Sequence, residues 1–178
     1  MIKIEQYNNA YKQQVIDLVL NIQQNEFNIP VTIEDQPDLL DIPAIYGKGN
    51  GGFWIAVKNN ILLGTIGLLD IGQNKYALRK MFVKKEFRGK EHLIALQLLG
   101  EVIQRCKNRK GETIYLGTIG KLKAARKFYE KNGFHKISPG KLPDFFPRVH
   151  VDTIFFELNI LNAGLAEDLT MTEKLQSQ

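Results

Sequence analysis

Residues Lys121–Phe134, KLKAARKFYEKNGF, are the stretch from which the fold is predicted most directly. Apolar and charged side chains alternate at helical spacing, which predicts a short amphipathic helix, and Asn132-Gly133 predicts its end. Tyr129 falls late on this helix. A phenol has a reference pKa of about 10, so Tyr129 is expected to be protonated at neutral pH and able to donate its proton to a departing thiolate. A buried aromatic side chain without chemistry is the alternative.

The segments on either side of this helix predict strands and one further helix. Thr113–Gly117 is typical of a buried strand, and Phe134–Ile137 and Val149–Leu158 predict two more strands, separated by a loop rich in proline and aromatic residues. Lys90–Lys107 carries leucine and isoleucine at helical spacing, and Tyr76–Val83 before it predicts a strand. Strands joined through helices indicate a mixed sheet with crossover connections.

The first half of the chain predicts an opening strand and helix and then a hairpin. Their ranges are Ile2–Tyr7, Tyr11–Ile22, Phe53–Val57 and Ile61–Leu69. Asn59 and Asn60 favour a tight turn between the hairpin strands, because asparagine tolerates positive φ. The intervening segment is rich in proline and glycine, which predicts loops with one short helix within Asp38–Tyr46. Binding residues often lie in such loops.

The composition is that of one globular domain. A chain of 178 residues accommodates a single sizeable core, so residues 1–158 are expected to form the domain and residues 159–178 a tail or short helix. No apolar run approaches the roughly 20 residues that cross a bilayer, so no membrane association is predicted. The first residues carry charges that do not fit the apolar core of a secretion signal, which favours a cytoplasmic location.

Cysteine, histidine and charge limit the kinds of ligand. Cys106 is the only cysteine, and the 3 histidines form no pair at metal-ligand spacing, so no metal is predicted. The net charge is +5, and the excess is concentrated in Arg79–Lys90 and Lys121–Lys131, which favours an anionic ligand. No nucleic-acid recognition motif or set of stacking aromatics accompanies it, so no nucleic-acid partner is predicted.

The second candidate site is the stretch 81–93, MFVKKEFRGKEHL. A strand is expected to run through a turn with Arg88-Gly89-Lys90 into a helix. Unsatisfied amides at a helix start, together with the helix dipole, can hold phosphate oxygens, and Gly89 lets the backbone come close. The residues therefore favour a pyrophosphate site, with a plain connecting loop as the alternative.

The two stretches together resemble the central motifs of the Gcn5-related N-acetyltransferase (GNAT) family. The later stretch matches the family ending Ala-x-x-Phe-Tyr-Glu-Lys-x-Gly-Phe at Ala125, Phe128, Tyr129, Glu130, Lys131, Gly133 and Phe134. The earlier stretch matches the loop Arg-x-x-Gly-x-Gly/Ala at Arg88, but Glu91 and Leu93 stand at its two small positions. Glu91 is expected to cap the helix favourably, or to repel the pyrophosphate if it faces inward.

The resemblance covers roughly residues 1–158 and implies an α+β domain. Its central sheet would be mixed, mostly antiparallel, with six to seven strands, flanking helices and a splayed strand pair at the acetyl-CoA site. Acetyl-CoA would be the cosubstrate, without a metal, and Tyr129 would be the general acid. The implied cofactor-binding residues are Met81, Phe82, Val83, Arg88, Gly89, Lys90, Glu91, His92, Leu93, Ala125 and Phe128.

The proton acceptor and the amine-binding residues are less marked in the sequence. Glu26, Asp70 and Asp152 are the candidate bases, and Glu26 ranks first because its loop borders the acceptor site in the family. Arg79 and Lys80 are expected on opposite faces of their strand, so that at least one faces the acceptor. Arg79, Arg148 and Asp152 are the expected acceptor-binding residues, and the cations favour a small amine that also carries an anionic group.

Two functions follow from this reading. The first is an N-acetyltransferase that joins acetyl-CoA to a primary amine by direct attack, with a homodimer as a possible assembly. The second is an acyl-CoA-binding regulatory module with little or no turnover, which the atypical Glu91 and Leu93 and the lack of an obvious base favour.

Overall fold

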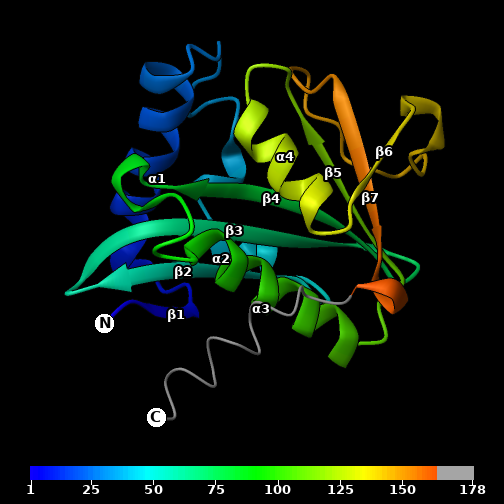
Figure 1. The fold of residues 1–178 in the computed structure, drawn as a ribbon, viewed down its shortest axis with the longest axis horizontal. Helices are drawn as coiled ribbons and strands as arrows, with labels where there is room; N and C mark the ends of the chain where they lie inside the picture. Colours follow the sequence, from blue (N-terminus) through cyan, green and yellow to red (C-terminus); the bar gives the residue numbers. More distant parts are fainter. Residues whose placement is uncertain (164–178) are drawn as a thin grey trace.

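The computed structural model describes residues 1–163, in which seven strands form one sheet in the order β1-β2-β3-β4-β5-β7-β6 (Figure 1). The strands are β1 (Lys3–Gln6), β2 (Gly52–Lys58), β3 (Ile61–Gly72), β4 (Lys75–Val83), β5 (Thr113–Thr118), β6 (His135–Ile137) and β7 (Ile154–Asn159). The helices are α1 (Lys12–Leu20), α2 (Ile42–Tyr46), α3 (Ile94–Asn108) and α4 (Lys123–Lys131). Only β4 and β5 pair in parallel. The predicted α+β class, with a mixed and mostly antiparallel sheet, is confirmed.

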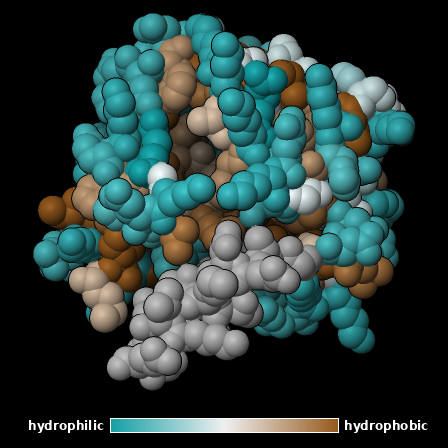
Figure 2. Space-filling model, viewed as in Figure 1, coloured by the Kyte–Doolittle hydropathy of each residue, from teal (hydrophilic) through white to brown (hydrophobic). Residues whose placement is uncertain are grey.

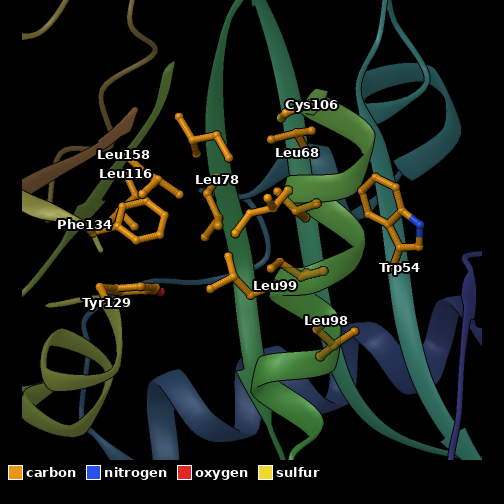
Figure 3. Packing of buried hydrophobic residues seen from close by; sticks show 14 of the residues in the cluster. Trp54, Leu68, Leu78, Leu98, Leu99, Cys106, Leu116, Tyr129, Phe134 and Leu158 are labelled. Atoms are coloured by element: carbon orange, nitrogen blue, oxygen red, sulfur yellow. The ribbon is translucent and has the colours of Figure 1, made fainter. Parts of the chain in front are cut away.

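Helices cover both faces of the sheet, and the residues of β2 show how. Phe53, Ile55 and Val57 pack with α1 and α2, whereas Trp54 and Ala56 join the cluster that contains the apolar face of α3. Figure 3 shows Trp54 on one side of α3 and Leu78 on the other. Successive side chains of a strand point to opposite faces of the sheet. Because both faces are covered here, β2 is apolar almost throughout.

The strands β4 and β5 separate along their length. Their parallel pairing is limited to Lys75–Ala77 with Thr113–Tyr115, although β5 continues to pair with β7 as far as Thr118. Beyond Ala77 the two strands diverge toward the end at which α4 begins (Figure 1). The splayed strand pair that the resemblance implied is therefore present. Beyond Ala77 and Tyr115, β4 and β5 no longer pair with each other.

A β-bulge in β4 corrects one prediction about side-chain direction. Gly67 pairs with Arg79 and Thr65 pairs with Phe82, so the two residues between them on β4 stand opposite one residue of β3. Lys80 takes a φ of 50° there, and the Thr65 hydroxyl donates to its carbonyl at 2.6 Å. Because a bulge breaks the strict alternation of a strand, Arg79 and Lys80 line the same cavity, and the prediction of opposite faces is wrong.

Several boundaries differ from those predicted. The tight turn at Asn59 and Asn60 is confirmed, with φ values of 51° and 63°. The helix expected from Lys90 begins at Ile94, and the strand expected from Val149 begins at Ile154, because 149–153 form a turn.

The first helix and the end of the domain also extend beyond the predicted bounds. The first helix continues as a π-helical segment, Asn21–Glu26. The fold runs past residue 158 into a 3₁₀ helix, Ile160–Asn162, that packs on α3. The rest of the predicted tail, 164–178, lies outside the described residues.

Candidate active site

Two cavities meet where β4 and β5 separate. The larger has a volume of about 650 Å³ and the smaller one of about 140 Å³. Both are lined by the same five residues, which form the wall between them: Met81, Phe82, Leu122, Ala125 and Tyr129. Figure 2 shows a hollow on this face of the molecule, with hydrophobic side chains at its bottom and hydrophilic side chains around it. We call these five residues the shared wall.

The larger cavity contains most of the predicted cofactor-binding residues. Those that line it are Met81, Phe82, Val83, Arg88, Gly89, Lys90, Leu93, Ala125 and Phe128. Glu91 and His92 do not line it, and the His92 ring packs beside Phe87 at a centroid distance of 5.3 Å. The lining is mostly apolar near α4 and basic near the loop, so it suits a ligand with an apolar part and an anionic end.

The loop before α3 ends in a strained residue rather than in a side-chain cap. Leu93 is the N-cap residue, with a φ of 52° and no capping hydrogen bond, so the predicted capping role of Glu91 is wrong. A left-handed backbone conformation is least strained for glycine. This explains why the motif Arg-x-x-Gly-x-Gly/Ala has a small residue at the position of Leu93. Ile94 and Ala95, at the start of α3, line the cavity. Free amides of this first turn favour an anion.

Arg88, which lines the larger cavity, forms an ion pair with Glu26. The guanidinium donates to both carboxylate oxygens of Glu26, at 2.8 Å for the Nη2 bond, and its Nε donates to the Val83 carbonyl at 2.8 Å. The hydrogen bond from Arg88 is the main reason why the pKa of Glu26 is lowered. Glu26 lines neither cavity. A paired carboxylate with a lowered pKa is a poor proton acceptor.

Tyr129 is held in the shared wall by aromatic neighbours. Its ring contacts those of Phe128, Phe134 and Phe156 at centroid distances of 6.0, 5.5 and 6.1 Å. Figure 3 shows the hydroxyl directed away from Phe134, toward the space between α4 and β4. Among the side-chain hydrogen bonds of residues 1–163 none involves this hydroxyl, and Tyr129 lines both cavities, so the hydroxyl is available to a ligand. Burial raises the pKa of Tyr129 above its ordinary value, and the charge of Asp152 adds to the rise.

The smaller cavity has a polar network on its far side that the sequence did not reveal. The Lys80 ammonium donates to Gln36 at 2.7 Å and lies 3.4 Å from the Asp38 carboxylate, which also accepts from the Tyr46 hydroxyl at 2.5 Å. Burial lowers the pKa of Lys80, and the nearby Asp38 opposes this effect. Gln36 and Asp38 are far from Lys80 in the sequence, so no local pattern predicts their contact. The only signal around Gln36 was proline, which favours a loop.

The predicted acceptor-binding residues fall in different places. Arg79 lines the smaller cavity and donates to the Pro147 carbonyl at 2.6 Å. Asp152 also lines it, from the turn before β7 rather than from the strand. Arg148 lies outside the lining, where its guanidinium stands 5.7 Å from the Phe155 ring and donates to the Pro139 carbonyl.

Asp152 lies in a space that a glycine leaves open. A Cβ atom on Gly117 would come within 2.4 Å of the Asp152 Oδ2 atom. Burial raises the pKa of Asp152 to about 6, while the charges of Arg79, Lys80 and His150 oppose the rise. The third candidate base, Asp70, accepts hydrogen bonds from the amides of Asn50 and Gly72 and lines neither cavity.

Metal binding and membrane spanning find no support in the described part of the chain. Residues 1–163 contain no group of three or more histidine, cysteine or acidic side chains placed to hold a metal ion. Cys106 is buried, and burial raises the pKa of its thiol to about 12. Over the same residues, no helix has the length and apolar character needed to cross a bilayer.

The chain is similar to a known family and to solved structures. The model of a family described as "Acetyltransferase (GNAT) family" matches residues 16–134. A GNAT-family acetyltransferase from Staphylococcus aureus Mu50 is 44% identical, with a TM-score of 0.87, over 90% of this chain and 99% of that one. The PaiA N-acetyltransferase of Thermoplasma acidophilum, solved with coenzyme A, shares the fold at 21% identity and a TM-score of 0.66, over 89% of this chain and 99% of that one.

A curated relative matches over a shorter length. "Probable N-acetyltransferase family 8 member 5" of Mus musculus is 28% identical over 106 residues, which are 57% of this chain and 46% of the relative. The chain thus spans about half the length of the curated relative that it matches.

Proposed function

Because this chain belongs to the GNAT acetyltransferase family, we propose that it transfers an acetyl group from acetyl-CoA to a primary amine. The observation that carries the proposal is the shared wall, where a cavity suited to a long anionic cofactor meets a small polar cavity at Tyr129. In this arrangement the thioester would lie at the wall, within reach of an amine from the smaller cavity. Positioning two reactants side by side is a large part of catalysis in such reactions.

The lining of the larger cavity fits acetyl-CoA. The backbone of Met81–Val83 would hold the pantetheine arm, and the start of α3 with Gly89 and Lys90 would hold the diphosphate. Glu91 and His92, which the resemblance included, have no contact role in this proposal because they do not line the cavity.

The chemical step follows from the position of Tyr129. A neutral amine attacks the thioester carbonyl carbon, and the resulting tetrahedral intermediate collapses by breaking the C–S bond. The thiolate that leaves takes the phenolic proton of Tyr129. Burial keeps this phenol protonated, since its pKa is raised, so the acid is in the correct state throughout the neutral pH range.

The smaller cavity favours a compact acceptor that carries both charges. A volume of about 140 Å³ is too small for a drug-sized ligand. Arg79 would bind an anionic group of the acceptor and Asp152 its amine, whereas Arg148 does not line the cavity and has no contact role in this proposal. A cytoplasmic location and a homodimer stay predictions.

The function is tested by an amine panel. The full chain is incubated with acetyl-CoA and amino acids, diamines, amino sugars and their phosphates, and thiol release is followed. We expect release with small amines that carry a carboxylate or phosphate. Binding of acetyl-CoA without release for any amine would instead support the regulatory module, which the atypical Glu91 and Leu93 first suggested.

Replacing Glu26 by glutamine is expected to strengthen acetyl-CoA binding. The cofactor diphosphate would compete with Glu26 for Arg88, so removing the carboxylate removes the competitor. Exposed ion pairs are worth about 0.2–1 kcal/mol, which corresponds to a dissociation constant lowered about 1.4-fold to fivefold in a calorimetric titration. Glu86→Gln removes a charge from the same loop without touching Arg88 and is the control. Weaker binding by Glu26→Gln would mean that the pair holds Arg88 in its binding position.

Replacing Gly117 by alanine is expected to lower kcat/KM for the amine about tenfold or more, because displacement by about an ångström already has large kinetic effects. The new Cβ would meet the Asp152 carboxylate and push it out of its place. Steady-state kinetics with an amine from the panel measures the effect. Thermal unfolding should be close to wild type, since a strand residue accepts alanine and the three atoms nearest to the new Cβ all belong to the Asp152 side chain. Gly120→Ala, at a position with open space, is the control, and equal kinetics for both variants would contradict the prediction.

A further inference from the structure

Among residues 1–163, three carboxylates line the two cavities: Asp35, Asp38 and Asp152. The first two have partners, since Asp35 accepts from Thr32 and Asp38 binds Lys80 and Tyr46. Within residues 1–163 the Asp152 side chain has neither a hydrogen bond nor an ion pair within 4 Å. Asp152 is half-buried, and a carboxylate that lines a cavity without a protein partner is free to contact a ligand there, which points to a role in function.

The position of Asp152 indicates that this role concerns the acceptor amine. Asp152 and Tyr129 line the smaller cavity together, one from the turn before β7 and the other from α4. Gly117 on β5 leaves the space in which the carboxylate lies. An amine in this cavity would therefore have a carboxylate and the shared wall, with its thioester, close by.

We propose that Asp152 accepts the proton of the attacking amine and returns it to Tyr129. This inference rests on the proposed acetyl transfer. The amine nitrogen forms a bond to the carbonyl carbon while one N–H proton passes to the Asp152 carboxylate. The C–S bond then breaks, and the thiolate takes the proton of Tyr129. The Asp152 proton moves to the phenolate, directly or through water. The balance is amine plus acetyl-CoA to acetylamide plus CoA thiol, with both side chains restored.

The two groups would assist each other through their charges. The ionised carboxylate of Asp152 raises the pKa of Tyr129, which makes the phenol a weaker acid. Once Asp152 has taken the proton of the amine, this negative charge is gone, and the pKa of Tyr129 falls. Tyr129 thus becomes a stronger acid at the step in which the thiolate leaves. Groups coupled in this way titrate as a pair.

Groups from three elements set the basicity of Asp152. Arg79 and Lys80 on β4 and His150 on the same turn lower its pKa, and burial, which is the largest effect, raises it. Tyr129 faces it from α4 as a neutral group. The pKa of about 6 that results makes Asp152 ionised at neutral pH and still basic enough to accept a proton.

The test compares Asp152→Asn with Asp144→Asn, a control in the exposed loop before the turn. With an amine from the panel, we expect Asp152→Asn to lower kcat on the order of 10²-fold and to leave the dissociation constant of acetyl-CoA unchanged. In wild type and control, kcat/KM for the amine should fall below pH 6 with an additional unit of slope, which Asp152→Asn removes. A variant with wild-type kcat and an unchanged pH profile overturns the inference while leaving the acetyltransferase function intact.

A stability measurement separates this role from a structural one. The folded pKa of Asp152 is raised, so its charge opposes folding above that pKa, and the opposition shrinks as the pH falls and the group becomes protonated. Asp152→Asn should therefore raise the melting temperature, and more at pH 8 than at pH 5. A variant that melts lower than wild type at both pH values shows a structural residue and overturns the inference. A wild type that acetylates no amine overturns the proposed function and this role with it.

Discussion

Tyr129→Phe is expected to lower kcat on the order of 10²–10³-fold at saturating substrates, the range found when a general acid is removed. Phenylalanine keeps the ring that packs against Phe128, Phe134 and Phe156 and removes only the hydroxyl. Because the phenol is needed when the C–S bond breaks, the loss should fall on kcat and not on the dissociation constant of acetyl-CoA. Thiol release gives kcat, and calorimetric titration gives the binding constant.

Tyr115→Phe is a matched control for this experiment. Tyr115 is also buried and aromatic, with its ring 6.3 Å from that of Phe146, but it lines neither cavity. Its replacement should leave kcat unchanged. Equal kcat values for wild type and Tyr129→Phe would remove Tyr129 from the proton transfer, whereas a weaker affinity for acetyl-CoA at unchanged kcat would make it a binding residue.

Lys80→Met is expected to destabilise the fold by about 3 kcal/mol, the lower end of the range for breaking a buried ion pair. The Lys80 and Asp38 side chains are only 9% and 13% exposed, so the Asp38 carboxylate would be left buried without its cation. The Tyr46 hydroxyl would still donate to it, which is why the lower end applies. The free energy of unfolding from urea titrations at pH 7.5 measures the change.

The second half of this prediction is a double variant. Lys80→Met with Asp38→Asn removes both charges and keeps an oxygen acceptor for Tyr46, so part of the lost stability should return. Lys58→Met, at an exposed lysine at the end of β2, is the control and should change stability little. A single variant Lys80→Met as stable as wild type would show that Asp38 does not need the lysine.

The elements predicted best from the sequence are those fixed by local patterns. The helix of Tyr129 ends as expected, because Gly133 with a φ of 92° lets the Phe134 amide reach the Tyr129 carbonyl at 3.0 Å. The hairpin turn at Asn59 and Asn60 depends on the same tolerance of positive φ. Such positions are specified by the residue itself, so they can be read before the fold is known.

The parts that were missed depend on contacts between distant segments. Glu26 looked like a base because of its loop, yet it is paired with Arg88, which is 62 positions away. Lys80 is turned into the smaller cavity by a bulge that no residue type at this position marks. Asp152 was placed on a strand, since apolar and polar residues alternate from Val149 into the apolar stretch of β7, but the turn before β7 holds it. In each case the side chain was noted, and tertiary structure decided its surroundings.

The shared wall separates two tasks that can change independently in evolution. The wall and the larger cavity are built mainly from β4, α3, α4 and the loop between β4 and α3, with Ile22 and Phe27 added from the segment after α1. Much of the remaining lining of the smaller cavity comes from two segments that do not line the larger one, residues 29–38 and 149–152. Substitutions, insertions or deletions in these two segments can alter which amine is accepted without disturbing the cofactor side. Diversification of acceptors among descendants of this chain is therefore expected to be concentrated there, while the wall itself drifts slowly.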